Sequence, residues 1–199
     1  MRWIQKISEY VRSQPDVFRF LVFGFGGYIV WHLMYEECLK PATLLDEFVT
    51  HHLIISTEWA MESLGYLVNA YFQVADGVFR TRVGVAGAAG VTVGPSCDGV
   101  VLFALFAIFI LSFPGHWLRK TWFIPAGIFV IHTANIFRII CLLWIQLYFG
   151  EDAMTFNHDY TFTVFVYGII FLLWYLYAAQ GSSEGPPTKR VSTVNSAAS

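Results

Sequence analysis

The sequence predicts an all-α integral membrane protein with about four transmembrane helices. Between the first and second it predicts a small external segment, part helix and part β-hairpin. Hydrophobic residues make up 56% of the 199 residues and charged residues only 13%, which leaves too little polar surface for an ordinary soluble globule. Several apolar runs also approach the roughly 20 residues that a bilayer requires. No nucleic-acid-binding pattern is present, and the net charge of -2 indicates no particular partner.

The apolar runs divide the chain into an interfacial helix, a membrane domain and a tail. Residues 1–16 place Trp3, Ile4 and Ile7 on one helical face, which is typical of a helix lying in the cytoplasmic interface. The membrane domain is expected over residues 17–179, with spans at about 17–34, 98–113, 121–149 and 161–179 and an external segment at 35–97. Residues 180–199 are rich in Gly, Ser and Pro and are expected to form a disordered cytoplasmic tail.

Along the external segment the hydrophobic pattern changes from helical periodicity to the alternation of a strand. Residues 44–67 predict one or two amphipathic helices. Asp76-Gly77 then separates Tyr71-Phe72-Gln73-Val74 from the alternating run 78–83, and an Asp-Gly pair in this setting is a strong hairpin signal. A further turn at 87–90 leads to Val91-Thr92-Val93. We therefore expect a small antiparallel sheet that ends close to Cys97.

Lysine and arginine are distributed unevenly between the two sides of a four-span chain. One side carries Arg2, Lys6, Arg12, Arg19, Arg119, Lys120, Lys189 and Arg190, whereas the other carries Lys40, Arg80 and Arg82 over a longer segment. Because cytoplasmic loops hold the excess of basic residues, both termini are expected in the cytoplasm. Cys97 and His158 then face the outer side of the membrane.

Cys97, Arg138 and His158 are the candidate catalytic residues. Cys97 stands at the mouth of an apolar helix, where a thiolate is stabilised by the positive end of the helix dipole. Arg138 lies about 26 Å into the third span if that span starts near Thr121, so it falls just inside the outer interface. The alternative roles are a small buried cysteine, an arginine that snorkels to headgroups, and a histidine anchored at the interface.

Together the three side chains predict thiol-based peptide-bond chemistry at the outer face of the membrane. The histidine takes the thiol proton and leaves a nucleophile at neutral pH. The arginine stabilises the oxyanion of an acyl-transfer intermediate. Asn135 lies one turn before Arg138 on the same helical face, where it could hold the guanidinium or a substrate carbonyl.

The order and spacing of these residues resemble the exosortase/archaeosortase family of membrane-embedded cysteine transpeptidases. The resemblance covers about residues 94–177. It rests on Cys97 with Gly99 before a span, Asn135-Ile136-Phe137-Arg138-Ile139 late in the next helix and Asn157-His158-Asp159 before the last span. The chain is similar to the short, core-only bacterial members, and the likeness is weaker upstream.

The resemblance implies a thiol protease or transpeptidase that sorts exported proteins in the bacterial inner membrane. Cys97 would be the nucleophile, with Arg138 and His158 as the second and third catalytic residues. Supporting or substrate-binding positions would be Asp98, Gly99, Asn135, Asn157 and Asp159. The implied substrates are membrane-anchored proteins whose C-terminal signal combines a short motif, a transmembrane helix and a basic tail. No cofactor and no metal is expected.

Asp98 departs from the pattern of the family, which leads us to expect a neutral residue after the cysteine. A carboxylate beside the thiol should raise the thiol pKa. Either Arg138 pairs with Asp98 or the activity is altered.

Other polar residues are expected to be structural. His132 lies deeper in the third span and should bond a neighbouring helix, and Cys141 should pack against helix or lipid. His51 and His52 lack a third ligand for a metal, and Cys38 lies in a loop without an assigned role.

Two other functions remain open at this point. One is a four-helix membrane thiol oxidoreductase, which needs paired cysteines, and only Cys38 and Cys97 are expected on one side. The other is a non-catalytic membrane assembly protein of the same fold.

Overall fold

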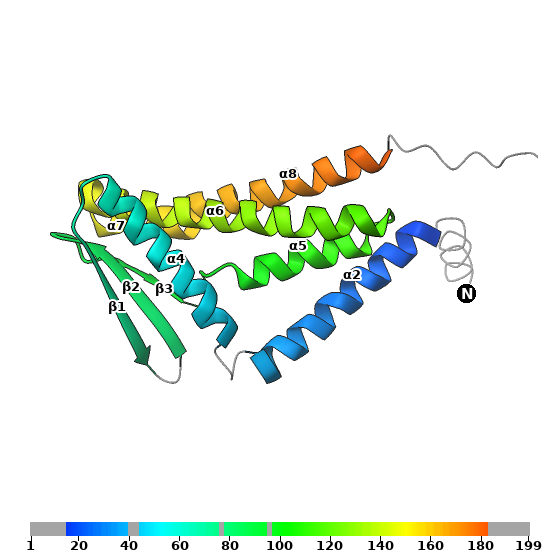
Figure 1. Ribbon diagram of the computed structural model, residues 1–199, viewed down its shortest axis with the longest axis horizontal. Helices are drawn as coiled ribbons and strands as arrows, with labels where there is room; N and C mark the ends of the chain where they lie inside the picture. Colours follow the sequence, from blue (N-terminus) through cyan, green and yellow to red (C-terminus); the bar gives the residue numbers. More distant parts are fainter. Residues whose placement is uncertain (1–14, 40–43, 76–77, 95–96, 183–199) are drawn as a thin grey trace, which may run out of the picture.

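The computed structural model describes residues 15–39, 44–75, 78–94 and 97–182. The interfacial helix expected over residues 1–16 lies outside them except for its last two residues, as does the tail beyond residue 182. Within the described ranges the chain is mostly helical and carries one small sheet. Figure 1 shows α5, α6 and α8 lying side by side, with α4 and the sheet at the end of the molecule opposite the two termini.

Three helical stretches are long and apolar enough to cross a bilayer, so the protein is a membrane protein. They are Val17–Leu39, Trp117–Phe149 and Glu151–Gln180. The first contains most of α2 (Pro15–Met34) and the π-helix η1 (Tyr35–Leu39), and the second is α6 (Trp117–Phe149). The third contains α7 (Glu151–Phe156), the π-helix η2 (Asn157–Thr161) and most of α8 (Phe162–Ser182).

The expected second span is shorter than a bilayer requires. The helix α5 covers Val100–Ser112, 13 residues, which rise only about 20 Å against a hydrocarbon layer of about 30 Å. By length, therefore, three helices and not four qualify as spans within the part of the chain that the structure describes. Two other boundaries also differ from expectation, because α6 begins at Trp117 and includes the basic pair Arg119-Lys120, and α8 runs to Ser182.

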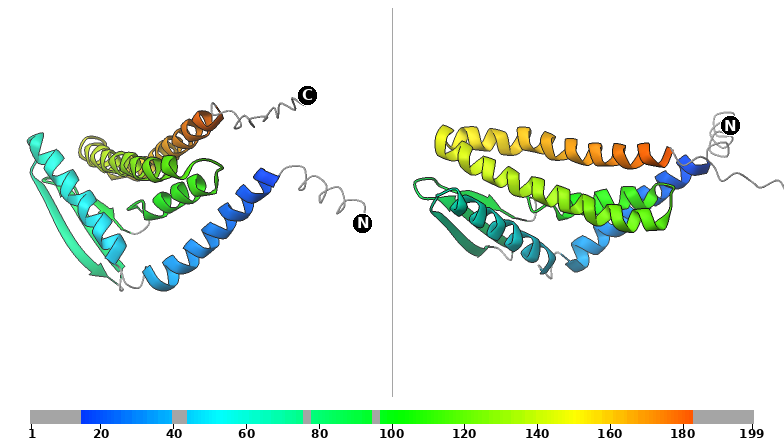
Figure 2. Two further views of the ribbon diagram at one scale, coloured as in Figure 1. Left: turned by 45° about the vertical axis from the view of Figure 1, so that its right-hand side comes forward. Right: turned by 45° about the horizontal axis from the view of Figure 1, so that its top comes forward.

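The segment between α2 and α5 folds into one helix and a three-stranded antiparallel sheet within its described residues. The helix is α4 (Leu44–Ser63), and the strands β1 (Val68–Ala75), β2 (Val78–Val85) and β3 (Val91–Val93) lie in the order β1-β2-β3. Ala75 pairs with Val78 in the register of the hairpin, while the Asp76-Gly77 turn itself lies outside the described residues. Figure 2 shows α4 running along one face of this sheet.

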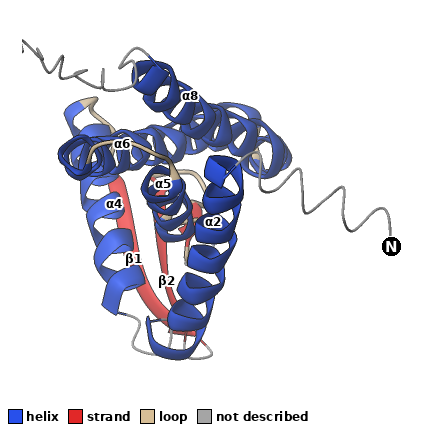
Figure 3. Cartoon of the chain, turned by 90° about the vertical axis from the view of Figure 1, so that its right-hand side faces the viewer, coloured by secondary structure: helices blue, strands red, loops and turns tan. Residues whose placement is uncertain are grey.

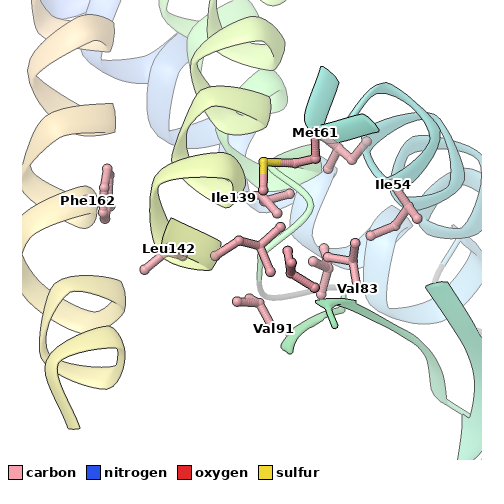
Figure 4. Close-up of a cluster of buried hydrophobic side chains, with 11 residues drawn as sticks. Ile54, Met61, Val83, Val91, Ile139, Leu142 and Phe162 are labelled. Carbon is pink, nitrogen blue, oxygen red and sulfur yellow. The ribbon is translucent and has the colours of Figure 1, made fainter. Parts of the chain in front are cut away.

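Two hydrophobic clusters hold these parts together. The outer cluster joins α4, the sheet, α6 and the start of α8 through Ile54, Met61, Val83, Val91, Ile139, Leu142 and Phe162 among others (Figure 4). Gln146 of α6 adds a polar anchor, since its side-chain amide accepts from the N–H of Gly90 at 2.8 Å and donates to the carbonyl of Gly90 at 3.3 Å. The strand β3, which leads into the loop of Cys97, is thereby fixed against α6.

The second cluster lies among the membrane helices. Its fully buried members are Phe106, Ile110, Ile131, Val166, Ile170 and Tyr177. Figure 3, seen along the helices, shows the short helix α5 beside α2 and α6. Close approach of α5 and α6 depends on Gly127, because a Cβ atom there would overlap the ring of the buried Phe106.

We predict that Gly127→Ala destabilises the protein by about 1–3 kcal/mol, the usual cost of overpacking a core. The matched control is Gly168→Ala in α8, where an added Cβ meets no atom within 4 Å. Replacing that glycine should be neutral or slightly stabilising, since alanine restricts the unfolded chain. Thermal unfolding in detergent measures both, and equal stability of the two variants would contradict the packing argument.

Candidate active site

The loop that carries Cys97 connects β3 to α5. The carbonyl of Gly94 accepts from the N–H groups of Cys97 at 2.7 Å and Asp98 at 3.0 Å, which closes a tight turn. Gly99 then has φ +91 at the N-cap of α5, a left-handed conformation that favours glycine. A Cβ at this position would also lie 3.4 Å from Nδ2 of Asn135. That distance is an ordinary van der Waals contact, so it is the backbone conformation that favours glycine at this position.

Asn135 holds this loop in place. Its Nδ2 donates to the carbonyls of Cys97 at 2.9 Å and Asp98 at 3.0 Å, and its side chain is 3% exposed. The sequence suggested that Asn135 holds the guanidinium of Arg138 or a substrate carbonyl. The structure differs, because the buried face of α6 turns the amide toward the start of α5, where two backbone carbonyls need a donor.

His158 meets the thiol of Cys97. Its Nε2 lies 3.3 Å from Cys97 Sγ, across 61 residues of sequence. His158 belongs to the π-helix η2, between α7 and α8. Such π-helical turns inside helical segments are frequent at functional sites because they redirect side chains and backbone groups.

Asp159 completes a chain of three side chains. Its Oδ1 lies 2.9 Å from Nδ1 of His158. A carboxylate at Nδ1 favours the tautomer that carries its hydrogen there, which leaves Nε2 as the acceptor facing the thiol. The side chains of His158 and Asp159 are 28% and 56% exposed, so a substrate can reach them. The arrangement has the order of a nucleophile, a base and an orienting acid.

Arg138 and Thr163 both contact the backbone carbonyl of His158. The guanidinium of Arg138 donates to it at 3.3 Å, and the hydroxyl of Thr163 donates at 3.4 Å. The two contacts fix the π-helical turn that presents the imidazole. Arg138 lies farther along its helix than expected, about 32 Å from the start of α6, because α6 begins at Trp117.

These groups line one cavity of about 420 Å³. Its walls come from the loop, α5, α6, η2 and α8: Cys97, Gly99, Val101, Leu102, Asn135, Arg138, His158, Asp159, Thr163, Val166 and Tyr167. One end of the cavity is polar and holds the thiol, the imidazole and the guanidinium. The side formed by α5 and α8 is apolar.

Two residues with expected supporting roles do not line the cavity. Asn157 donates its Nδ2 to the carbonyl of Ala153 in α7 at 2.8 Å, a local contact that caps the helical turn. Asp98 is fully buried, and its Oδ1 accepts from the N–H of Val100 at 2.9 Å at the start of α5. No ion pair joins Asp98 to Arg138, both of which the structure describes. Of the two alternatives that the sequence left open, pairing of Asp98 with Arg138 is therefore not observed.

Burial raises the pKa of Asp98 from its ordinary value of 3.8 to about 8. The hydrogen bond from Val100 opposes this shift, and the neighbouring Asp46 adds to it. Asp98 precedes α5 and lies outside the long membrane helices.

The remaining polar residues have structural partners. Nε2 of His132 lies 2.8 Å from Nδ1 of His52 on α4, the neighbouring-helix contact expected of His132. Cys141 packs against the outer hydrophobic cluster. Cys38 is exposed at the end of η1 and is not among the residues that line the cavity.

Sequence reasoning missed two contributions to the site. The sequence predicts Asp159 as a supporting residue but assigns it no partner, although its position next to His158 indicates that the two side chains could interact. Thr163 follows His158 by five residues, which is the spacing of a π-helical turn. The five-residue spacing indicates a contact between Thr163 and His158 only once the π-helix is known.

Comparison with known proteins does not assign a family or a function to this site. No family model, no curated protein and no solved structure matches the chain.

We predict that His158→Ala slows alkylation of Cys97 by iodoacetamide about 10-fold at neutral pH. Without the imidazole the thiol loses its proton acceptor, and the thiolate, which is the reacting form, becomes scarce. Mass spectrometry of the Cys97 peptide gives the rate, and the exposed thiol of Cys38 in the same sample is the internal control. An unchanged rate at Cys97 would show that His158 does not activate the thiol.

Proposed function

We propose that the protein is a membrane-embedded cysteine peptidase or transpeptidase. It cleaves C-terminal sorting signals of exported proteins at the periplasmic face of the inner membrane of a bacterium. The observation that carries this proposal is the contact of Cys97 Sγ with His158 Nε2 at 3.3 Å, with Asp159 at the other imidazole nitrogen. The resemblance to the exosortase/archaeosortase family supplies the substrate class.

The chemistry begins with the thiol of Cys97. His158 takes the thiol proton at Nε2, and the thiolate attacks the carbonyl carbon of the scissile peptide bond. The guanidinium of Arg138 lines the same cavity and faces the oxyanion as negative charge develops. The imidazolium then gives its proton to the leaving amine, and a thioester to Cys97 remains. Water or an amine acceptor resolves the thioester and regenerates the thiol.

The proposal includes α5 as a fourth membrane element. Although it is only 13 residues long, it lies against both α6 and α2, which are long enough to span. With both termini in the cytoplasm, the loop before α5 and the segment η2 face the periplasm. The cavity then opens where an anchored substrate emerges from the bilayer. The apolar wall formed by Val101, Leu102 and Val166 suits the apolar helix of such a substrate.

In cells that express a cognate substrate, Cys97→Ala should leave the full-length precursor in the membrane. Cys38→Ala and Cys141→Ala are matched controls and should process the precursor normally. An immunoblot of precursor and product at equal enzyme abundance gives the result. Normal processing by Cys97→Ala would refute the peptidase, whereas loss of activity in Cys38→Ala would favour a dithiol oxidoreductase.

Arg138→Lys should lower the turnover of the precursor about 10²- to 10³-fold, the usual cost of removing one oxyanion donor. Lysine keeps the charge, but it does not reproduce the planar guanidinium, which donates to the His158 carbonyl and still offers further N–H groups. A residue that only snorkels to headgroups would tolerate lysine. Turnover close to wild type, at matched membrane abundance, would reduce Arg138 to an anchor.

A further inference from the structure

Two buried carboxyl groups and a tyrosine form a cluster that the proposed chemistry does not use. Asp98 is 0% exposed, Asp46 of α4 is 3% exposed and Tyr35 of η1 is 6% exposed. None of the three lines the cavity. Aspartate is almost never fully buried unless it is paired, so two of them directly behind the loop of Cys97 require an explanation.

The hydrogen bonds of the cluster leave one oxygen without a donor. The Tyr35 hydroxyl lies 3.0 and 3.1 Å from the two carboxyl oxygens of Asp46 and donates its single hydrogen there. Oδ1 of Asp98 accepts from Val100. Oδ2 of Asp98 is buried and has no hydrogen-bond partner among the described residues. Two ionised carboxyls cannot share such a site.

We propose that Asp98 is a protonated positioning residue, whose Oδ2 hydroxyl donates to the Asp46 carboxylate and so ties α4 to the loop that carries Cys97. The shared proton satisfies the one oxygen that lacks a donor, and Tyr35 fixes the acceptor. The positioning role rests on the proposed function, because it matters only if Cys97 is the nucleophile.

The electrostatics of the cluster agree with this assignment. After burial, the neighbouring carboxyl of Asp46 and the charge of Cys97 are the influences that raise the pKa of Asp98. These are the titratable groups that face Asp98 from α4 and from its own loop, and Tyr35 of η1 reaches it through Asp46. Each disfavours a negative charge on Asp98.

A protonated Asp98 also explains how an aspartate can follow the nucleophile. The family pattern calls for a neutral residue at this position, and the neutral acid provides one while still donating a hydrogen bond. An ionised Asp98 would oppose formation of the adjacent thiolate and would repel Asp46. We therefore expect the loop to loosen as the pH rises through about 8, where Asp98 loses its proton.

The test replaces the acid by its neutral isostere. In Asp98→Asn the side-chain amide donates to Asp46 at every pH, whereas Asp98→Ala removes the donor. Precursor processing by Asp98→Asn should stay within about 3-fold of wild type. Asp98→Ala and Asp46→Ala should lose about 10-fold or more, in line with the loss of a buried hydrogen bond to a charged group. Iodoacetamide alkylation of Cys97 should change in the same order.

Infrared spectroscopy of the full-length protein reports the proton directly and needs no substrate. Wild type should show the carbonyl band of a buried protonated carboxyl at neutral pH, and the band should vanish as the pH rises above about 8. Asp98→Asn should lack the band. Because the pKa is raised in the folded state, the stability of wild type should fall as the pH rises from about 4 to about 8. Asp98→Asn should show less of that fall.

Two results would overturn the proposal. One is the absence of a protonated carboxyl band that depends on Asp98, and the other is a loss of processing in Asp98→Asn as large as in Asp98→Ala. Failure of this proposal can be distinguished from failure of the proposed function. A band abolished by Asp98→Asn, in a protein that cleaves no sorting signal, would support the shared proton and refute only the peptidase.

Discussion

The two hydrogen bonds from the side-chain amide of Asn135 to the carbonyls of Cys97 and Asp98 are the contact on which the site depends. The loop between β3 and α5 is irregular backbone at the edge of the membrane helices, and its buried carbonyls need donors that neither a strand nor a helix supplies. Asn135 provides both from the rigid helix α6. The same helix carries Arg138 one turn farther on, so α6 fixes the position of both the loop and the guanidinium.

A second irregularity, the π-helix η2, places the histidine. Between α7 and α8 its backbone departs from the regular α-helical hydrogen-bond pattern. The carbonyl of His158 accepts hydrogen bonds from Arg138 and Thr163. The imidazole is thereby aimed at Cys97 by contacts to its backbone as well as by Asp159. Both halves of the candidate site thus consist of irregular backbone that side chains from α6 hold in place.

The small sheet and α4 form a support behind this site. Val91 and Val93 of β3 are buried in the outer hydrophobic cluster, and Gln146 fastens the turn at Gly90 to α6. The loop of Cys97 follows directly after β3, so the packing of β3 in that cluster also restrains the position of the thiol. On the other side of the loop Asp98 faces Asp46 of α4. The sheet and α4, which contribute no residue to the cavity, therefore support the loop of Cys97 from behind.

The sequence by itself determined the membrane character, the strands on either side of Asp76-Gly77, and the short list of candidate residues. Apolar runs and period-2 alternation are local patterns, and polar residues at membrane depth are costly enough to stand out. Only the tertiary structure decided which groups meet. Asn135 binds a loop 37 and 38 residues away, and Asp98 turns from Arg138 toward Asp46. The length of α5 was likewise settled in three dimensions, where Gly99 and the turn before it start the helix at Val100. A local pattern fixes the face of a helix, but the neighbour that covers this face comes from distant sequence. Burial among such neighbours is also what raises the pKa of Asp98.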